Sequence, residues 1–181
     1  DLGITGIWLM PMMESPTYHG YDVSDYYEIE VDYGTMEDFE EFLEQAHLRG
    51  IKVIIDLVLN HTSNQHPWFI QSANNQNNYR DWYIWSENNP GFTGPWGQNI
   101  WHYNQGNYYY GLFWSGMPDL NYEHQSVKQE MINVANFWLN KGVDGFRLDA
   151  IKYLIEDASN LENTPATFSL IEDFNSAYKY T

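Results

Sequence analysis

Three short apolar segments with the composition of buried strands alternate along the chain with two amphipathic helical segments. We expect strands at residues 6–10, 51–59 and 146–149, and helices over residues 36–49 and 127–141. When strands and helices alternate in this way, the strands run parallel and each helix makes a right-handed crossover. The alternation therefore predicts an α/β protein built on a parallel sheet or barrel.

Local sequence signals mark the ends of the two predicted helices. Thr35 followed by Asp38 has the form of a capping box, in which each side chain accepts a hydrogen bond from the backbone N–H of the other residue. Ser126 followed by Gln129 predicts a second capping box, and Gly142 predicts the end of that helix.

Polar residues occupy the carboxyl ends of the second and third predicted strands. They are Asp56, Asn60 and His61 in the second segment, and Arg147 and Asp149 in the third. Residues two apart in a strand point to the same face, so Arg147 lies beside Asp149 and keeps it ionised, as a nucleophile or general base requires. The alternatives are a surface ion pair, a buried hydrogen-bond acceptor and a structural histidine. Five such residues at this end of parallel strands favour a catalytic site.

The connection between the second and third strands is about twice as long as a crossover needs. Its excess, residues 62–122, is rich in Asn, Gly, Tyr and Trp and shows little helical periodicity. A low-complexity segment is the alternative, but disordered segments lack so many aromatic residues. We therefore expect an irregular, ordered subdomain inserted at the end of the second strand.

The charge balance and composition exclude several classes of partner. The 25 acidic and 8 basic residues give a formal net charge of −17, which repels phosphate backbones, so nucleic acid is not expected to bind. No apolar run approaches the roughly 18 residues of a membrane helix, and no membrane partner is expected. The chain has no cysteine, which excludes disulfides and thiolate metal sites. The acidic, cysteine-free composition favours an extracellular location.

Four motifs resemble signature regions of the α-amylase superfamily, glycoside hydrolase family thirteen. They are "YHGYDVSDYYEIEVDYGT" (18–35), "DLVLNH" (56–61), "MPDLN" (117–121) and "GFRLDAIKY" (145–153), in the order in which that family carries them. The resemblance implies a partial (β/α)8 TIM barrel containing the second to fourth strands, with an irregular domain B inserted after the third strand.

The same resemblance divides the chain into three parts. Residues 1–61 are expected to hold the second and third barrel strands, residues 62–122 to form domain B, and residues 123–181 to hold the third helix, the fourth strand and the segment after it. The first residues resemble a strand that follows a helix, and no closing element is predicted in the last ones. We therefore expect an internal fragment of a larger catalytic domain.

The resemblance also assigns roles to the charged residues at the strand ends. Asp149 resembles the nucleophile that forms the covalent glycosyl–enzyme intermediate of a retaining mechanism. Arg147 resembles the guanidinium that orients this nucleophile. Asp56 resembles a buried carboxylate that supports the site without taking part in the chemistry.

Four further residues resemble substrate contacts of the family. Tyr21 resembles the residue that stacks on the sugar at the scissile position, and His61 resembles one that hydrogen-bonds a hydroxyl of that sugar. His19 resembles a further contact there, and Lys152 resembles a contact on the leaving-group side of true α-amylases.

Asn60 and Asp119 match positions that hold a calcium ion between the barrel and domain B in calcium-dependent members of the family. Their oxygen atoms are the ligands that calcium prefers. The resemblance therefore implies calcium as a cofactor.

The resemblance places the general acid, a glutamate on the next barrel strand, outside residues 1–181. Glu156, Glu162 and Glu172 follow the nucleophile, but none lies in a strand context that resembles that of the acid. A glycosidic oxygen is a poor leaving group without a proton donor. We therefore expect residues 1–181 alone to be inactive.

The expected substrate of the parent enzyme is an α-1,4-glucan such as starch or a maltooligosaccharide, hydrolysed as an α-amylase does. Ala150 after the nucleophile, Lys152, and Tyr18 in place of the aspartate typical of exo-acting glucosidases favour this assignment. An α-glucosidase, oligo-1,6-glucosidase or neopullulanase is the alternative within the family. Outside it, a non-catalytic barrel scaffold would lack the nucleophile, and a barrel with a metal-activated water would need clustered ligands.

Overall fold

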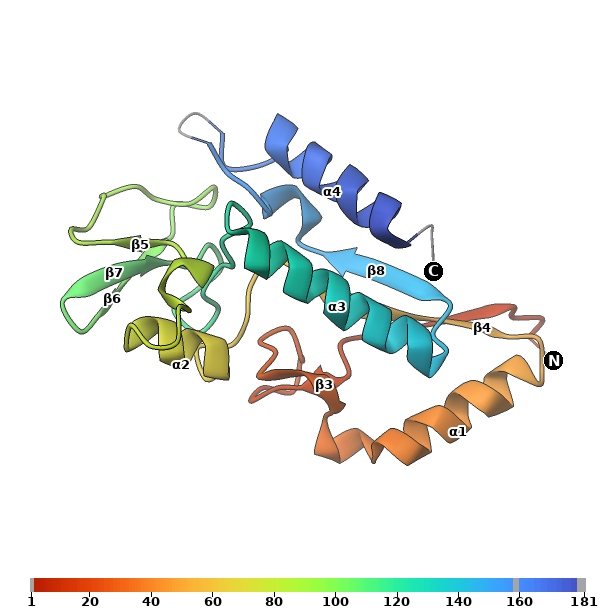
Figure 1. Cartoon of the computed structure of the whole chain (residues 1–181). Coiled ribbons are helices and arrows are strands. Elements are labelled where there is room, and N and C mark those ends of the chain that lie inside the picture. Colours follow the sequence, from red (N-terminus) through yellow and green to blue (C-terminus); the bar gives the residue numbers. More distant parts are fainter. Residues whose placement is uncertain (1, 158–159, 179–181) are drawn as a thin grey trace.

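A three-stranded parallel sheet lies at the centre of the molecule (Figure 1). The computed structural model describes residues 2–157 and 160–178. The sheet is formed, in spatial order, by β1 (Gly6–Leu9), β4 (Lys52–Val58) and β8 (Gly145–Asp149). These are the three strands predicted from the sequence, and their parallel pairing confirms the predicted α/β class.

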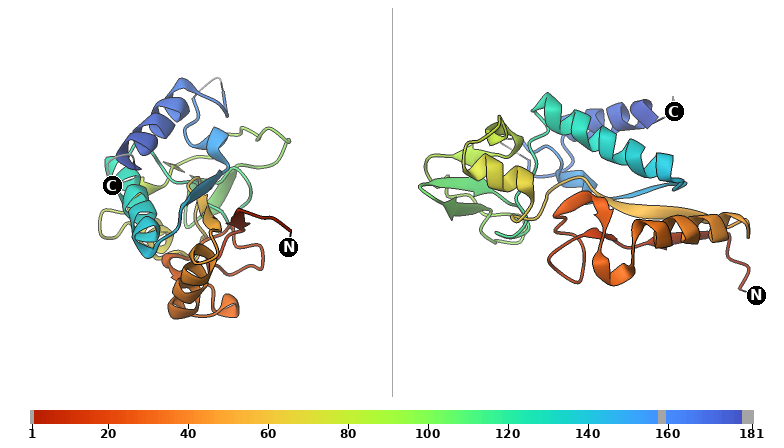
Figure 2. Two further views of the ribbon diagram at one scale, coloured as in Figure 1. Left: turned by 90° about the vertical axis from the view of Figure 1, so that its right-hand side faces the viewer. Right: turned by 60° about the horizontal axis from the view of Figure 1, so that its bottom comes forward.

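Three helices lie along one side of this sheet (Figure 2). They are α1 (Met36–His47), α3 (Gln125–Lys141) and α4 (Pro165–Tyr178). The apolar face of α1 buries Phe39, Leu43 and Ala46, and the interior of β4 provides Val53 and Ile55. Burial of each large apolar side chain contributes roughly 1.5–3 kcal/mol, which is what fixes the helices on the sheet.

The predicted start of α1 is confirmed. The Thr35 hydroxyl accepts a hydrogen bond from the Asp38 backbone N–H at 3.2 Å, and the Asp38 carboxylate accepts one from the Thr35 backbone N–H at 2.8 Å. Both halves of the capping box are therefore formed.

The predicted start of α3 is wrong. The helix begins at Gln125 with His124 as N-cap, so Ser126 lies inside the first turn and forms no capping box with Gln129. Asn121 is the reason, because its backbone and side-chain oxygens accept hydrogen bonds from the backbone N–H groups of His124 and Glu123 and turn the chain into the helix earlier. The predicted end is confirmed, since Gly142 adopts the left-handed conformation that terminates α3.

The helix α4 was not predicted from the sequence. Thr164 precedes it, and the Thr164 hydroxyl accepts a hydrogen bond from the Thr167 backbone N–H at 3.1 Å. Pro165 occupies the first helical position, where its missing N–H costs nothing. Leu170 and Phe174, one turn apart, are the buried apolar residues that attach the helix to the core.

The predicted insertion contains more regular structure than expected. It holds a short helix and an antiparallel sheet of order β5-β7-β6, formed by α2 (Pro67–Ala73), β5 (Trp85–Ser86), β6 (Trp101–Asn104) and β7 (Asn107–Tyr110). The tight turn between β6 and β7 has Gln105 and Gly106 at positive φ, which is the geometry of a two-residue hairpin loop. This unit forms the end of the molecule at the left of Figure 1.

A two-stranded antiparallel sheet follows β1 and pairs β2 (Met13–Glu14) with β3 (Asp25–Ile29). The loop between these strands reaches the carboxyl-terminal half of β4, where the Tyr21 hydroxyl lies 3.5 Å from Asp56 Oδ2. In the described part of the chain, no helix has the length and apolar character needed to cross a membrane.

Candidate active site

The three charged residues predicted at the strand ends lie together. The register places Asp56 of β4 beside Arg147 of β8. Arg147 Nη1 donates to Asp149 Oδ1 at 2.5 Å and to the two Asp56 oxygens at 3.1 and 3.2 Å. One guanidinium therefore bridges two carboxylates on the same face of the sheet.

Burial of Asp56 and the charged contacts of Arg147 act together on the electrostatics of this end of the sheet. Asp56 is buried, and desolvation raises its pKa although the Arg147 cation opposes the shift. Desolvation lowers the pKa of Arg147, but hydrogen bonds and charges from Asp56 and Asp149 outweigh it, so the pKa is raised. The guanidinium is a permanent cation, and it also lies 5.4 Å from the ring centre of Trp8 on β1. Sequence reasoning did not find Trp8, because nothing local marks which strand residue faces the arginine.

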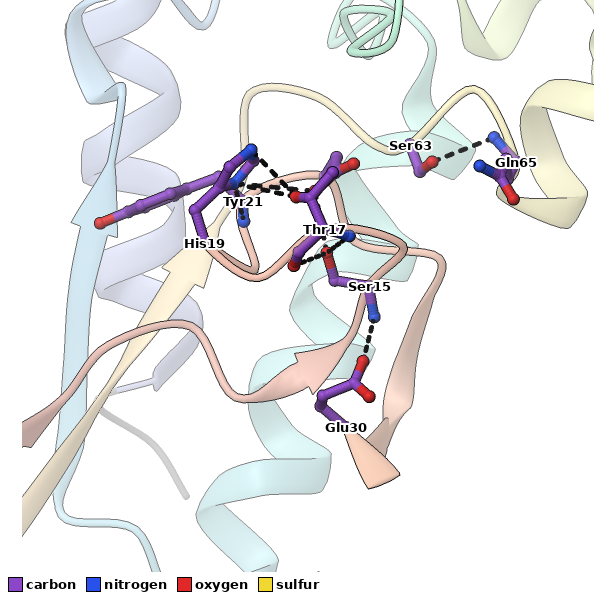
Figure 3. Close-up of polar contacts among 8 residues, drawn as sticks. Ser15, Thr17, His19, Tyr21, Glu30, Ser63 and Gln65 are labelled. Atoms are coloured by element: carbon purple, nitrogen blue, oxygen red, sulfur yellow. Dashed lines mark hydrogen bonds and ion pairs between the residues drawn. The ribbon is translucent and has the colours of Figure 1, made fainter. Parts of the chain in front are cut away.

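The loop between β2 and β3 positions His19 and Tyr21 (Figure 3). The Tyr21 backbone N–H donates to His19 Nδ1 at 3.1 Å, and the Thr17 hydroxyl lies 2.9 Å from His19 Nε2. The rings of His19 and Tyr21 are stacked with centroids 6.0 Å apart. Gly20 allows the sharp bend between them, since its φ is +76° and a Cβ there would lie 2.8 Å from Pro11.

His61 follows β4 and is buried in a neutral form. Burial lowers the pKa of its imidazole to about 4, so the ring is uncharged near neutral pH. Its Nε2 atom has no hydrogen-bond partner among the described residues. A buried polar atom of this kind costs free energy unless a ligand satisfies it.

A cavity of about 380 Å³ connects Asp149 with His19, Tyr21 and His61. Its lining residues come from the β2–β3 loop, the end of β4, the segment after β7 and the end of β8; they are His19, Tyr21, His61, Phe113, Trp114, Met117 and Asp149. Sequence reasoning missed Phe113 and Trp114 as site residues, although it identified the inserted segment as rich in aromatics. The Phe113 ring packs edge-on against His61 with centroids 5.2 Å apart. The cavity thus combines one carboxylate, two imidazoles and several aromatic faces, which suits a sugar ring.

Lys152 lies outside the residues that line this cavity. It belongs to the short 3-10 helix η3 (Ile151–Tyr153), which begins after Ala150 adopts a left-handed conformation with φ of 51°. The Lys152 ammonium pairs with the Glu162 carboxylate at 2.6 Å and lies 4.7 Å from the ring centre of Tyr153. Its predicted substrate contact therefore stays a prediction.

Asn60 and Asp119 lie together but bind each other directly. The Asn60 amide nitrogen donates to Asp119 Oδ2 at 2.8 Å, and the Leu112 backbone N–H donates to Asp119 Oδ1 at 2.9 Å. Burial, reinforced by the nearby Glu156 carboxylate, raises the pKa of Asp119 well above its ordinary value. Asn60 Oδ1 is the one side-chain oxygen of the pair without a partner among the described residues.

This donor set does not fit calcium as it is arranged. The ion takes six to eight oxygen ligands, including ionised carboxylates. Both Asp119 carboxyl oxygens already accept hydrogen bonds, one from Asn60 and one from the Leu112 backbone N–H. Within residues 2–157 and 160–178, no group of three or more His, Cys, Asp or Glu side chains could hold a metal ion.

Comparison with known proteins identifies the family. Residues 1–180 match the family described as alpha amylase, catalytic domain. The chain belongs to the α-amylase catalytic-domain family. The predicted resemblance to glycoside hydrolase family thirteen is confirmed, and the parallel sheet is part of the TIM barrel of these enzymes.

Individual members of the α-amylase family are similar over most of the chain. "Alpha-amylase 3" of Dictyoglomus thermophilum is 53% identical over 88% of the chain, which spans 31% of that protein. The oligo-1,6-glucosidase of Parageobacillus thermoglucosidasius is 44% identical over 85% of the chain, which spans 29% of that protein. The crystal structure of an α-amylase from H. orenii superimposes with a TM-score of 0.88 and 48% identity, over 99% of the chain and 37% of that structure.

Proposed function

We propose that the chain provides the nucleophile-bearing part of a retaining glycoside hydrolase that acts on α-1,4-glucans. The observation that carries the proposal is a cavity lined by both Asp149, which accepts a hydrogen bond from Arg147, and His61, whose Nε2 has no partner among the described residues. A neutral imidazole donates to or accepts from a sugar hydroxyl, and Tyr21 offers a ring to the apolar face of the sugar.

In the proposed first step, a carboxylate oxygen of Asp149 forms a bond to the anomeric carbon while the bond to the leaving oxygen breaks. Arg147 holds the Asp149 carboxylate in place through a hydrogen bond to its Oδ1 atom and compensates the charge of the neighbouring Asp56. The leaving oxygen takes a proton from a general acid, and water then cleaves the glycosyl ester in the second step.

The general acid is proposed to come from outside residues 1–181. Retaining enzymes need two carboxyl groups about 5–5.5 Å apart across the scissile bond. Among the described residues, Asp149 is the one carboxylate that lines the cavity. We infer that residues 1–181 do not hydrolyse glucans by themselves, and that the reaction belongs to a longer protein that contains them.

The test is to trap the intermediate on that longer enzyme. A fluorinated glucosyl fluoride forms the glycosyl ester quickly and releases it slowly, so one sugar should stay attached to Asp149. We expect the digested protein to show a single labelled peptide that contains residues 145–149, identified by mass spectrometry. Label on another carboxylate, or inactivation without label, would contradict the assignment.

A preference for α-1,6 bonds is the second candidate, because an oligo-1,6-glucosidase is 44% identical to the chain. Small Ala150, directly after the nucleophile, favours α-1,4 bonds. Parallel assays of maltotriose and isomaltotriose separate the two substrates.

We propose further that the Asn60–Asp119 hydrogen bond joins the end of β4 to the inserted segment without a calcium ion. Chelator in excess is therefore expected to leave the melting temperature of the enzyme unchanged, because an ion that binds only the folded state would stabilise it. A lower melting temperature that added calcium restores would overturn this proposal and support the calcium prediction.

A further inference from the structure

An aromatic cluster extends the wall of the cavity outward along the inserted segment. The rings of Trp96, Phe113 and Tyr153 contact one another, with centroids 5.8 to 6.0 Å apart. Phe113 also contacts His61 inside the cavity. A continuous series of ring contacts therefore links His61, in the candidate sugar site, to Trp96 on the surface.

Trp96 is exposed at the surface, and a hydrogen bond from its backbone N–H fixes the position of its loop. The residue is 61% exposed, whereas Tyr153, whose ring contacts the Trp96 ring, is buried. A single exposed aromatic residue is common on a protein surface, but Trp96 continues the aromatic wall of a cavity, and contiguous apolar surface of this kind marks a binding site. An indole offers the flat, rigid surface on which the apolar face of a sugar packs.

Gln98 holds the loop that carries Trp96. Its side-chain oxygen accepts a hydrogen bond from the Trp96 backbone N–H at 2.9 Å, and its amide nitrogen donates to the Leu112 carbonyl at 2.9 Å. Gly94 makes room for this side chain, since a Cβ there would lie 2.2 Å from Gln98 Nε2. The loop is thus fastened to Leu112, the residue before Phe113.

We propose that Trp96 is a stacking platform for glucose units that lie beyond the sugar bound at Asp149, and that Gln98 is the residue that positions it. The inference rests on the proposed function, because it names a further binding position for the same glucan. The proposal predicts discrimination by substrate length. Trp96 favours longer oligosaccharides and has no contact with a substrate confined to the cavity.

Phe92 supplies a matched control on the same loop. It is 69% exposed, but it lines a different cavity, which Ile84 and Ile100 also line. Phe92→Ala therefore removes an aromatic of similar exposure from the same loop without touching the cluster.

The experiment compares kcat/KM for maltoheptaose and for a nitrophenyl glucoside in the longer enzyme. Trp96→Ala is expected to lower the value for maltoheptaose about tenfold, mainly through KM, and to leave the value for the nitrophenyl glucoside unchanged. Trp96→Tyr keeps an aromatic ring and should retain most of the affinity. Gln98→Ala should reproduce part of the KM increase with kcat unchanged, which a general loss of folding would not do.

Two results would overturn the inference in an active enzyme. One is an equal kcat/KM for maltoheptaose in Trp96→Ala and Phe92→Ala. The other is an equal loss on both substrates in Trp96→Ala with an unchanged melting temperature. An unmutated enzyme that cleaves no α-glucan would instead contradict the proposed function, so the two failures are distinguishable.

Discussion

Replacement of Asp149 by asparagine should lower the release of reducing sugar from starch by about a thousandfold or more in the enzyme that contains this chain. An amide has no nucleophilic oxygen that forms a stable glycosyl ester, so the first chemical step is lost. The amide oxygen still accepts the Arg147 hydrogen bond, which is 2.5 Å long in the unmodified protein. Oligosaccharide affinity, measured by calorimetry, should therefore stay within a few-fold of the unmodified enzyme.

Asp144 provides the control for this substitution. It precedes β8 at the opposite end of the strand, where it pairs with Lys52 at 2.7 Å and His47 at 2.8 Å. Asp144→Asn removes the same charge from the same segment, yet it should keep full turnover. An Asp149→Asn enzyme that retains more than a few per cent of the activity, with Asp144→Asn as reference, would exclude Asp149 as the nucleophile.

The parts of the site that could be predicted from the sequence are those fixed by local periodicity. Alternation along a strand has a period of two, so Arg147 and Asp149 had to share a face. The parallel order of the strands then brought Asp56 to the same end of the sheet. The polar end of the second strand indicated His61, and the resemblance added His19 and Tyr21; the structure places all three around one cavity with Asp149.

The parts that escaped prediction depend on contacts between distant segments. Phe113 reaches His61 because β7 and the end of β4 converge, and no local pattern encodes this approach. The start of α3 is set by the turn at Asn121, which overrides the capping signal at Ser126. α4 has a usable signal in Thr164 before Pro165, with Leu170 and Phe174 one turn apart. That signal is weak because, among the described residues, only these two apolar positions mark the buried face of the helix.

Replacement of Arg147 by methionine should affect both activity and stability, for different reasons. Methionine keeps the length of the side chain but donates no hydrogen bond, so Asp149 is no longer held in the attacking position. Loss of one charged hydrogen bond at a reacting group costs about a hundredfold or more in turnover. Expected kinetics are a lower kcat with a smaller change in KM, measured on maltoheptaose.

The stability effect should depend on pH through Asp56. Burial already raises the pKa of Asp56, and without the Arg147 cation this pKa rises further. A carboxyl group whose folded pKa is raised contributes stability that is fully present below its unfolded pKa of about 4 and is lost as the pH rises through the folded pKa. Arg147→Met should therefore lower the melting temperature most at neutral and alkaline pH, and least in acid. The loss of free energy of unfolding is expected to reach at most about 3 kcal/mol, since Arg147 is itself 41% exposed.

A double variant separates the two roles of the arginine. Asp56→Asn in the Arg147→Met background removes the buried charge that lost its partner, so the melting temperature at neutral pH should recover. Turnover should not recover, because Asp149 still lacks the hydrogen bond that orients it. If the double variant regained both stability and turnover, Arg147 would act only by compensating the charge of Asp56. If the double variant regained neither stability nor turnover, the Arg147 bridge between Asp56 and Asp149 would not be the interaction that stabilises β4 and β8. These strands would then be held at the carboxyl end of the sheet by other contacts.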